Sequence, residues 1–354
     1  MTPLPQPFPL LDPARRHEVH LVLSAHLSNP NGDLDAGNAP RVNPFTGHGI
    51  ISAVSIKRKA RDYVAAVYAG EPGMELFIRH GQALSTVVQQ ALTEAGVPAG
   101  PATTLTPEDL AALMDSGLPD AFQITEGGTV TYDGTLKGKD LRALTDRLIQ
   151  GGVPAALAAQ LTALTDKKPA GPGRRTLQDQ ARPVLVTRYW DARVFGYTAP
   201  DSAGKLRGPV QVTDAESTQP VNLVEQVLTR VARSQPGEKE GANIIRRTVV
   251  DHAVYVATVH INPYRTHGGA VTSRDLQVLL EGLWHGQALA RSSTRPDVRV
   301  QALVIVSHAT ALGNAPAHAL ARRLTITHDG AHDVQVTFDT HHLPAGVTVH
   351  LIQA

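Results

Sequence analysis

The chain contains no cysteine, few aromatic residues and no long apolar run. Without cysteine it has no disulfide, no thiolate metal site and no cysteine nucleophile. Aromatic residues make up only 4% of its 354 residues, which argues against a large stacking platform for single-stranded nucleic acid. No apolar stretch reaches about 18 residues, and the proline-rich beginning lacks the apolar core of a signal peptide. We therefore expect a soluble, cytoplasmic protein.

The overall charge is nearly balanced, with 33 basic and 32 acidic residues and a formal net charge of +1. Any nucleic-acid site must therefore rest on local clusters of charge. Residues 52–68 carry four basic residues against one acid, a net +3, on a spacing of apolar residues that predicts a helix. Lys57 and Arg61 lie four residues apart and so share a helix face, with Arg58 beside them.

A second basic cluster lies in residues 229–249, where five basic residues oppose two acids, again a net +3. Its polar, glycine-containing tip is typical of an arm that reaches away from the body of a protein. A solvated charged face is the alternative for both clusters. The second cluster contains Arg230, Arg233, Arg246 and Arg247.

A polar loop lies between a predicted strand at residues 18–26 and the basic helix. Its residues, Asn29 to Arg41, are rich in Asn, Asp, Gly and Pro, which form turns and side-chain-to-backbone hydrogen bonds. Asp33 and Asp35 could hold a divalent metal or act as a general base in RNA cleavage. We favour the alternative, in which the Asn31-Gly32-Asp33 segment forms turns that shape the loop.

Other catalytic patterns find no support. The 16 histidines include close pairs such as His328 and His332, but none lies in a His-Glu-x-x-His frame or beside a well-spaced carboxylate, so we predict no metal and no cofactor. Gly204-Lys205 lacks the leading glycine and the following Ser or Thr of a phosphate-binding loop. No Gly-x-Ser-x-Gly sequence is present, which removes the main signature of a serine hydrolase.

The remaining patterns predict an α+β sandwich that resembles a ferredoxin-like or RNA-recognition-motif core with two elaborations. We expect an alanine-rich helical insertion at residues 73–184 and an amphipathic helix at 272–290. A further helical piece is predicted at 222–232. Strands are predicted at 184–195, 208–213, 251–262 and 298–308, with a terminal hairpin pairing 334–338 with 348–352.

Several motifs together resemble the CRISPR-associated protein 7 family, the backbone subunit of CRISPR type I effector complexes, most closely its subtype I-C form. The similarity runs in order through nearly the whole chain. It rests on Asn29 to Arg41, Thr46 to Gly49, Ile56 to Lys59, Asp191 to Gly196, Arg207 to Gln211, Leu228 to Arg230, Arg246-Arg247, Ile261 to Pro263 and Gly313 to Ala317.

The resemblance implies a single elaborated domain, residues 1–354, shaped like a right hand. A modified RNA-recognition-motif palm would comprise residues 1–72, 185–213 and 251–354, with helical fingers at 73–184 and a thumb at 214–250. It also implies no enzymatic activity. Several copies would stack head-to-tail along the guide RNA (crRNA), beside CRISPR-associated protein 5 and the large and small subunits of the complex. The guide would pair with a strand of the target DNA.

The guide-binding residues that the sequence and the resemblance suggest are Asn31, Arg41, Lys57, Arg58, Arg61, Arg207, Gln211, Arg230, Arg233, Arg246 and Arg247. The alternative is a metal-dependent endoribonuclease, because type III backbone subunits, which resemble this fold, cut target RNA with a loop aspartate. Asp33 or Asp35 would then be the catalytic residue.

Overall fold

The computed structural model divides into two compact units. The first comprises Met1–Glu71 and Gly208–Ala354, and the second Pro72–Arg207. The structure describes residues 8–96, 102–114, 118–119, 121–124, 128–132, 136, 138–166, 174–198, 204–230, 243–265, 271–328 and 333–354.

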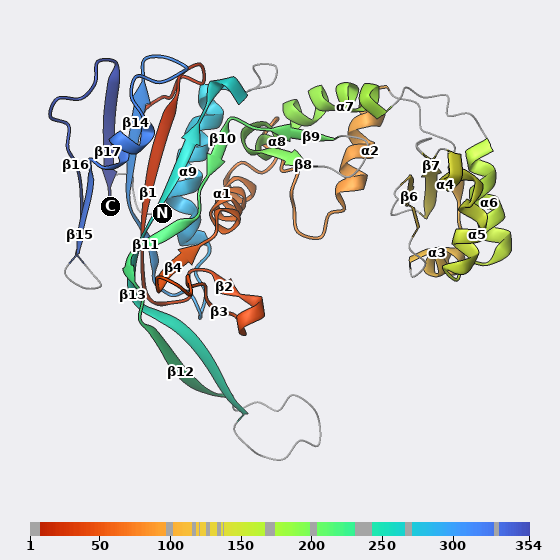
Figure 1. The fold of residues 1–354 in the computed structure, drawn as a ribbon, viewed down its shortest axis with the longest axis horizontal. Coiled ribbons are helices and arrows are strands. Elements are labelled where there is room, and N and C mark those ends of the chain that lie inside the picture. Colours follow the sequence, from red (N-terminus) through yellow and green to blue (C-terminus); the bar gives the residue numbers. More distant parts are fainter. Residues whose placement is uncertain are drawn as a thin grey trace. The chain divides into compact units, whose positions relative to one another are not determined.

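The first unit is built on an antiparallel sheet with the strand order β17-β14-β1-β13-β11-β4, in which β10 and β12 also pair with β13 (Figure 1). The central strand β1 is buried along nearly its whole length, which its β-branched and leucine-rich sequence predicts. The strands are β1 (His17–Ser28), β4 (His48–Ile51), β10 (Val210–Val212), β11 (Ala215–Pro220), β12 (Leu223–Arg230), β13 (Asn243–Ile261), β14 (Val298–His308) and β17 (Val347–Gln353).

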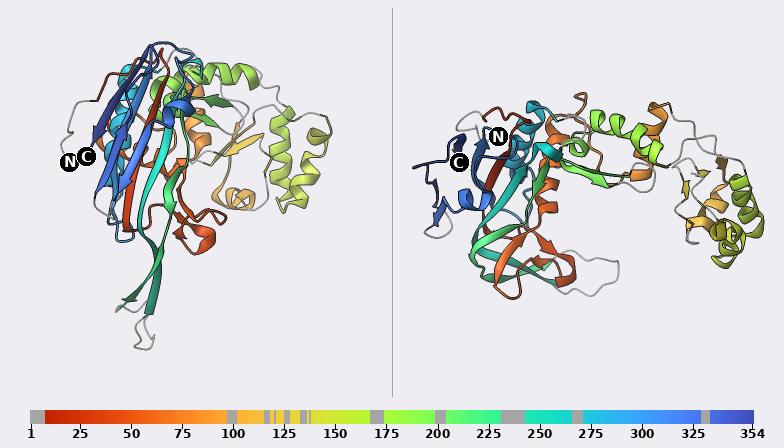
Figure 2. Two further views of the ribbon diagram at one scale, coloured as in Figure 1. Left: turned by 60° about the vertical axis from the view of Figure 1, so that its left-hand side comes forward. Right: turned by 45° about the horizontal axis from the view of Figure 1, so that its top comes forward.

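Helices α1 (Ala53–Val67) and α9 (Ser273–Leu289) lie side by side in this unit (Figures 1 and 2). Their close approach requires glycine, because a Cβ on Gly286 would lie 2.6 Å from the carbonyl oxygen of Lys59. Ser52 caps the start of α1, and Thr272 and Asp275 form a capping box at the start of α9. Both predicted helices are confirmed.

A hairpin packs against the sheet as well. It consists of β15 (Leu324–His328) and β16 (Val334–Phe338), and its Val336 is buried in one cluster with Val22 of β1 and Val304 of β14. The predicted terminal hairpin is therefore wrong, because β16 pairs with β15 and β17 pairs with β14. The apolar face of β16 needs an adjacent apolar strand, and β15 supplies it. The short elements here are η2 (Pro263–Arg265) and α10 (Ala317–Ala321).

Strand β12 pairs residue by residue with the first part of β13, from Leu223 opposite Val250 to Arg230 opposite Asn243. The two strands form a ribbon that extends from the sheet (Figure 1). The helix predicted at residues 222–232 is therefore wrong. Its partner is the β-branched first part of β13, which begins 13 positions beyond Arg230, at Asn243. Pairing with this strand outweighs the local helical pattern of residues 222–232.

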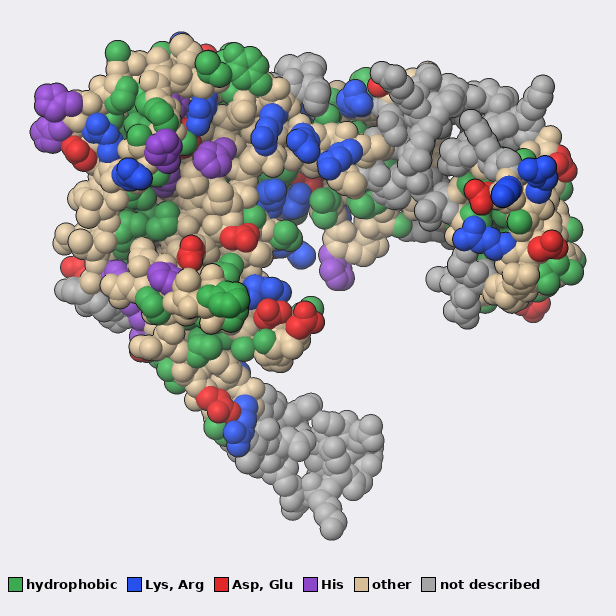
Figure 3. Space-filling model, viewed as in Figure 1, with side chains coloured by type: hydrophobic (Ala, Val, Ile, Leu, Met, Phe, Trp, Pro, Cys, Tyr) green, Lys and Arg blue, Asp and Glu red, His purple; other side chains and the backbone are tan. Residues whose placement is uncertain are grey.

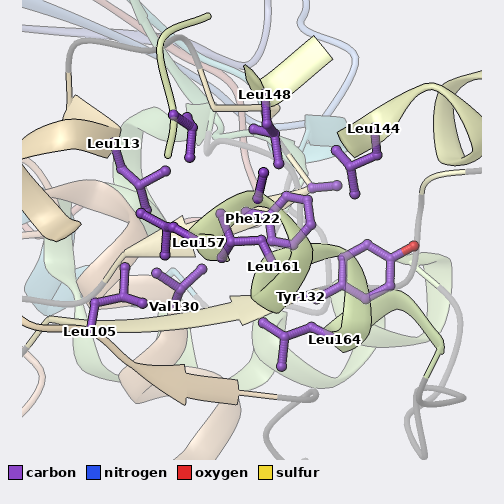
Figure 4. Packing of buried hydrophobic residues seen from close by; sticks show 13 residues of the cluster. Leu105, Leu113, Phe122, Val130, Tyr132, Leu144, Leu148, Leu157, Leu161 and Leu164 are labelled. Carbon is purple, nitrogen blue, oxygen red and sulfur yellow. The ribbon is translucent and has the colours of Figure 1, made fainter. Parts of the chain in front are cut away.

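The described residues of the second unit are mainly helical and form two apolar clusters. One surrounds Phe77, Val88 and Leu185, and the other surrounds Phe122, Leu148 and Leu161 (Figure 4). Its elements are α2 (Leu84–Glu94), β5 (Ala102–Thr104), α3 (Pro107–Met114), β6 (Phe122–Ile124), β7 (Thr129–Tyr132), α4 (Gly138–Arg142), α5 (Leu144–Gln150), α6 (Ala155–Asp166), α7 (Arg174–Arg188), α8 (Trp190–Phe195), β8 (Gly196–Thr198) and β9 (Lys205–Arg207).

The strand predicted at residues 184–195 is wrong, because this segment forms the end of α7 and all of α8. Its Val, Thr, Tyr, Trp and Phe residues have high β-propensity. However, Leu185 and Tyr189 pack with Phe77 and Val88, a set of contacts that a helix provides. Residues 185–207 consequently belong to the second unit. Among the described residues, no helix is long and apolar enough to cross a membrane.

Candidate nucleic-acid interface

The loop from Asn29 to Arg41 is fastened to the start of α1. The side-chain Oδ1 of Asn31 accepts a hydrogen bond from the backbone N–H of Ser52, at 2.8 Å, and the Asn31 carbonyl accepts one from the N–H of Arg41. Asn29 Nδ2 donates to the carbonyl of Asn38 at 2.6 Å. Asn31 therefore holds the loop in place through its amide oxygen.

Asp33 shapes the same loop. Its Oδ1 accepts a hydrogen bond from the N–H of Asp35 at 3.3 Å and lies 3.2 Å from Nη2 of Arg41. The short strands β2 (Gly32–Asp33) and β3 (Ala39–Pro40) pair on either side of the 3-10 helix η1 (Leu34–Ala36). Figure 3 shows acidic side chains gathered over these elements, with a basic side chain beside them. Among the described residues, no group of three or more His, Asp or Glu side chains is arranged to hold a metal ion.

The three basic residues predicted on α1 have different environments. Arg58 is exposed and forms an ion pair with Asp62, with 2.7 Å between Nε and Oδ1. Arg61 is buried. Lys57 is partly buried, and burial, followed by the charge of Arg61, lowers the pKa of its ammonium group. Lys57 and Arg61, which share a helix face, therefore repel each other where they are partly shielded from solvent.

Lys59 and Arg295 are two further cations whose charges interact, a relation that the sequence did not predict. Lys59 is only 7% exposed, and its Nζ donates to Ser55 Oγ at 3.0 Å. Burial, followed by the charge of Arg295, lowers the pKa of Lys59 to about 8. Arg295 Nε donates to the carbonyl of Asn29 at 3.2 Å, so this positive charge lies where the loop begins. The basic run in residues 52–68 indicated Lys59 as a candidate cation, but no sequence pattern predicted that Arg295 would lie near α1.

The segment 291–296, which carries Arg295, also contacts the ribbon. Arg247 Nη1 donates to the carbonyl of Ser293 at 2.6 Å, and its Nε donates to Gln226 Oε1 at 2.8 Å. The N–H of Asn29 donates to the carbonyl of Thr294. This segment therefore contacts the loop at Asn29 and the ribbon at Arg247, and its Arg295 lies close enough to Lys59 of α1 for their charges to interact.

The other predicted ribbon residues are Arg230, Arg233 and Arg246. Arg246 is exposed and pairs with Glu225, with 3.2 Å between Nη1 and Oε1. Arg230 ends strand β12, and Arg233 lies outside the described residues. The ribbon thus adds Arg246 and Arg247 to the basic surface of the first unit.

Arg207 and Gln211 belong to different units. Arg207 is an exposed residue of β9 in the second unit. Gln211 lies on β10 in the first unit, where its Nε2 donates to the carbonyls of Gly208 and Val210 at 3.1 and 2.9 Å. The Gln211 amide therefore stabilises the turn into β10.

The Asp191-to-Gly196 motif builds the fold of the second unit. The buried Asp191 carboxylate accepts hydrogen bonds from the N–H groups of Phe77 and Ile78, at 2.6 and 3.2 Å. Arg193 donates to the carbonyls of Val186, Thr187 and Gly73. These two side chains fasten the segment at the beginning of this unit to α7 and α8.

Comparison with known proteins identifies the family. A sequence model described as "CRISPR-associated protein Cas7" matches residues 15–343. The chain belongs to the Cas7 family. A protein named "CRISPR-associated protein Cas7" from Haloferax volcanii is 28% identical to it over 126 residues, which cover 35% of each chain, so the match spans about a third of that relative.

Solved structures are also similar. A chain of a "CRISPR RNA-guided surveillance complex, pre-nicking" has 15% identity and a TM-score of 0.44, with coverage of 82% of this chain and 78% of the other. A chain of a "CRISPR RNA-guided surveillance complex" has 17% identity and a TM-score of 0.38, with 82% and 75% coverage.

Proposed function

We propose that this Cas7-family protein binds a guide RNA without cutting it and forms the backbone of a type I-C surveillance complex. The observation that carries the proposal is the cluster of cations around the start of α1. Lys59 is buried and Arg295 is partly buried, their charges are close enough to interact, and burial disfavours the charge of each. A phosphate group would supply the negative charge that relieves both.

The arrangement of the first unit supports a palm of the RNA-recognition-motif type. Along the chain, β1, α1, β10, β13, α9 and β14 follow the β-α-β-β-α-β order of ferredoxin-like folds. In the sheet, these strands lie in the order β14-β1-β13-β10. The β12–β13 ribbon would be the thumb and the second unit the fingers.

A backbone that accepts any guide sequence must hold phosphates and leave base edges free. Lys57, Arg58, Lys59 and Arg295 suit this role, because cations contact phosphate oxygens whatever the base. Copies of the chain would follow one another along the guide in the cytoplasm, with CRISPR-associated protein 5 and the large and small subunits as further partners. The exposed base edges would then pair with a strand of the target DNA.

The alternative, an endoribonuclease, has less support. Oδ1 of Asp33 is engaged by Arg41 and by the N–H of Asp35, contacts that shape the loop and hold this carboxylate to it. We therefore propose a structural role for Asp33, and none in catalysis for Asp35.

The salt dependence of guide binding tests this proposal. Replacement of Lys57 and Arg58 by Gln should weaken binding to guides of every sequence. Each lost phosphate contact should reduce the log–log salt slope by about 0.7, because fewer counterions are displaced from a single strand. The matched control replaces Lys139 and Arg142 of α4 by Gln, the same change in charge on the second unit. An unchanged slope in the α1 variant would contradict the proposal.

A further inference from the structure

An exposed aromatic ring projects from the first unit at the turn before β4. Phe45 is 95% exposed. Its backbone is nevertheless held firmly, because its N–H donates to Asn43 Oδ1 at 3.0 Å and the N–H of Gly47 donates to the Asn43 carbonyl at 2.9 Å. The Gly47 carbonyl in turn accepts a hydrogen bond from Val221, next to β12. A large apolar ring on a fixed turn is typical of an anchor residue at a protein interface.

The same unit contains a pocket of about 300 Å³. It lies between the end of α9, the start of β14 and the C-terminal residue, and its apolar lining includes Trp284, Leu289, Val298 and Val300. A cavity of about 150 Å³ is enough to hold benzene, so a phenyl ring would enter this pocket without strain.

The ring and the pocket lie on opposite sides of the sheet. The turn with Phe45 precedes β4, the last strand on one side, whereas the pocket borders β14, next to the edge strand β17 on the other. The ring and the pocket also lie at similar positions along the direction of the strands. Val298 is opposite Ala25, Ala25 is opposite Ala253, and Leu223, close after Val221, is opposite Val250. A displacement across the strands would therefore bring the ring of one copy to the pocket of the next.

The charges beside the two features are complementary. Exposed Glu216 lies on β11, opposite Ile50 of β4, on the side of the ring. Arg291 and Arg299 line the pocket, and Arg299 is already paired with Asp297. Contact between the two sides would bring Glu216 towards Arg291, which favours this orientation over like sides meeting.

We propose that Phe45 of one copy inserts into the pocket at Trp284 of the next copy. The inference rests on the proposed function, which requires repeated copies along one guide, and it names the surfaces that join them. The ring and the pocket are different surfaces, so the contact is heterologous and leaves a free ring at one end and a free pocket at the other. Such a contact adds copies in one direction and forms an open filament.

The absence of cysteine permits a direct test by crosslinking. Phe45→Cys and Ala288→Cys are introduced together; Ala288 lines the pocket and is exposed. After assembly on guide RNA and mild oxidation, a non-reducing gel should show a ladder of three or more linked copies. Either single variant should give at most linked pairs, because a single cysteine can join only two chains.

A second variant measures the contribution of the ring without new covalent bonds. Phe45→Glu should raise the protein concentration needed for assembly on the guide at least tenfold. Leu312→Glu, a matched change at an exposed apolar residue in the loop after β14, should leave it unchanged. Assemblies that form on RNA normally but show no ladder and tolerate Phe45→Glu would overturn the inference and leave the proposed function intact. A protein that binds no guide would overturn both.

Discussion

Replacement of Lys59 by Met should have opposite effects on stability and on guide binding. The ammonium group is buried and is surrounded mainly by other cations, with the charge of Asp62 only partly offsetting them. Met keeps most of the apolar volume and removes the charge. We therefore expect the RNA-free variant to be more stable than the wild type at pH 7, and to bind guide RNA more weakly.

The magnitude follows from the lowered pKa. A decrease from 10.5 to about 8 corresponds to about 3 kcal/mol of disfavoured charge at neutral pH, at about 1.4 kcal/mol per unit. The lost hydrogen bond to Ser55 offsets about 1 kcal/mol of this, which leaves a gain of about 2 kcal/mol. Between pH 8 and 10.5 the unfolded chain binds more protons than the folded one, so the stability of the wild type rises with pH there. In the Met variant this contribution should be absent.

Guide binding should depend on pH in the opposite sense. A phosphate beside Lys59 stabilises the charged ammonium and raises its pKa, so binding takes up a proton above pH 8 and the affinity of the wild type should fall as pH rises. The Met variant should bind more weakly at pH 7 and show a flatter profile.

Urea unfolding of RNA-free protein and fluorescence anisotropy with labelled guide, both from pH 7 to 9.5, measure the two effects. The matched control is Lys139→Met, which removes an exposed lysine on α4 and should change neither. A destabilised Lys59→Met variant, or one that binds guide as the wild type does, would refute the reasoning.

Three further predictions concern carboxylates. Asp33→Asn should affect guide binding only mildly, because the amide keeps an oxygen for the Asp35 N–H. Asp33→Ala should lower the free energy of unfolding by about 1 kcal/mol in a denaturation assay. Magnesium- or manganese-dependent cleavage of guide-complementary RNA by the wild type, abolished in Asp33→Asn, would contradict this structural role. Asp191→Ala should destabilise the second unit by about 2 kcal/mol or more in urea unfolding, because it removes the acceptor of the Phe77 and Ile78 N–H groups. The exposed Asp179→Ala is its control, and equal stabilities would show that Asp191 is not an anchor. Burial tends to raise the pKa of Glu18, but His308 and Arg16 outweigh this effect and lower that pKa. The ionised Glu18 carboxylate should therefore contribute its full stability above about pH 4.5 and lose it as the pH falls further. The stability of Glu18→Gln, measured by unfolding in acid, should depend less on pH than that of the wild type, and identical acid profiles would count against this contribution.

The elements that the sequence predicted correctly are those with a strong local pattern. Strand β14 matches the predicted 298–308, and α9 lies within the predicted 272–290. The errors occur where partners distant in sequence decide the structure. Residues 222–232 form a strand because β13 pairs with them, and residues 184–195 form helices because they pack against Phe77 and Val88.

The candidate site follows the same division. The basic character of α1 and the turn-forming role of Asn31 and Asp33 could be predicted from residue types alone. The burial of Arg61 could not, because it depends on how α1 lies within the unit. The interaction between the charges of Lys59 and Arg295 follows from the hydrogen bonds that hold segment 291–296 against Asn29. No spacing of residues along the chain predicts that segment 291–296 lies against Asn29.

The most direct test of the proposed function is the composition of the protein purified from cells that also express a CRISPR array and the partner subunits. Native mass spectrometry, together with the ratio of absorbance at 260 and 280 nm, gives the number of protein copies and the mass of bound RNA. We predict several copies of the chain on one guide RNA of defined length. Purification as a monomer free of nucleic acid under these conditions would contradict the proposal.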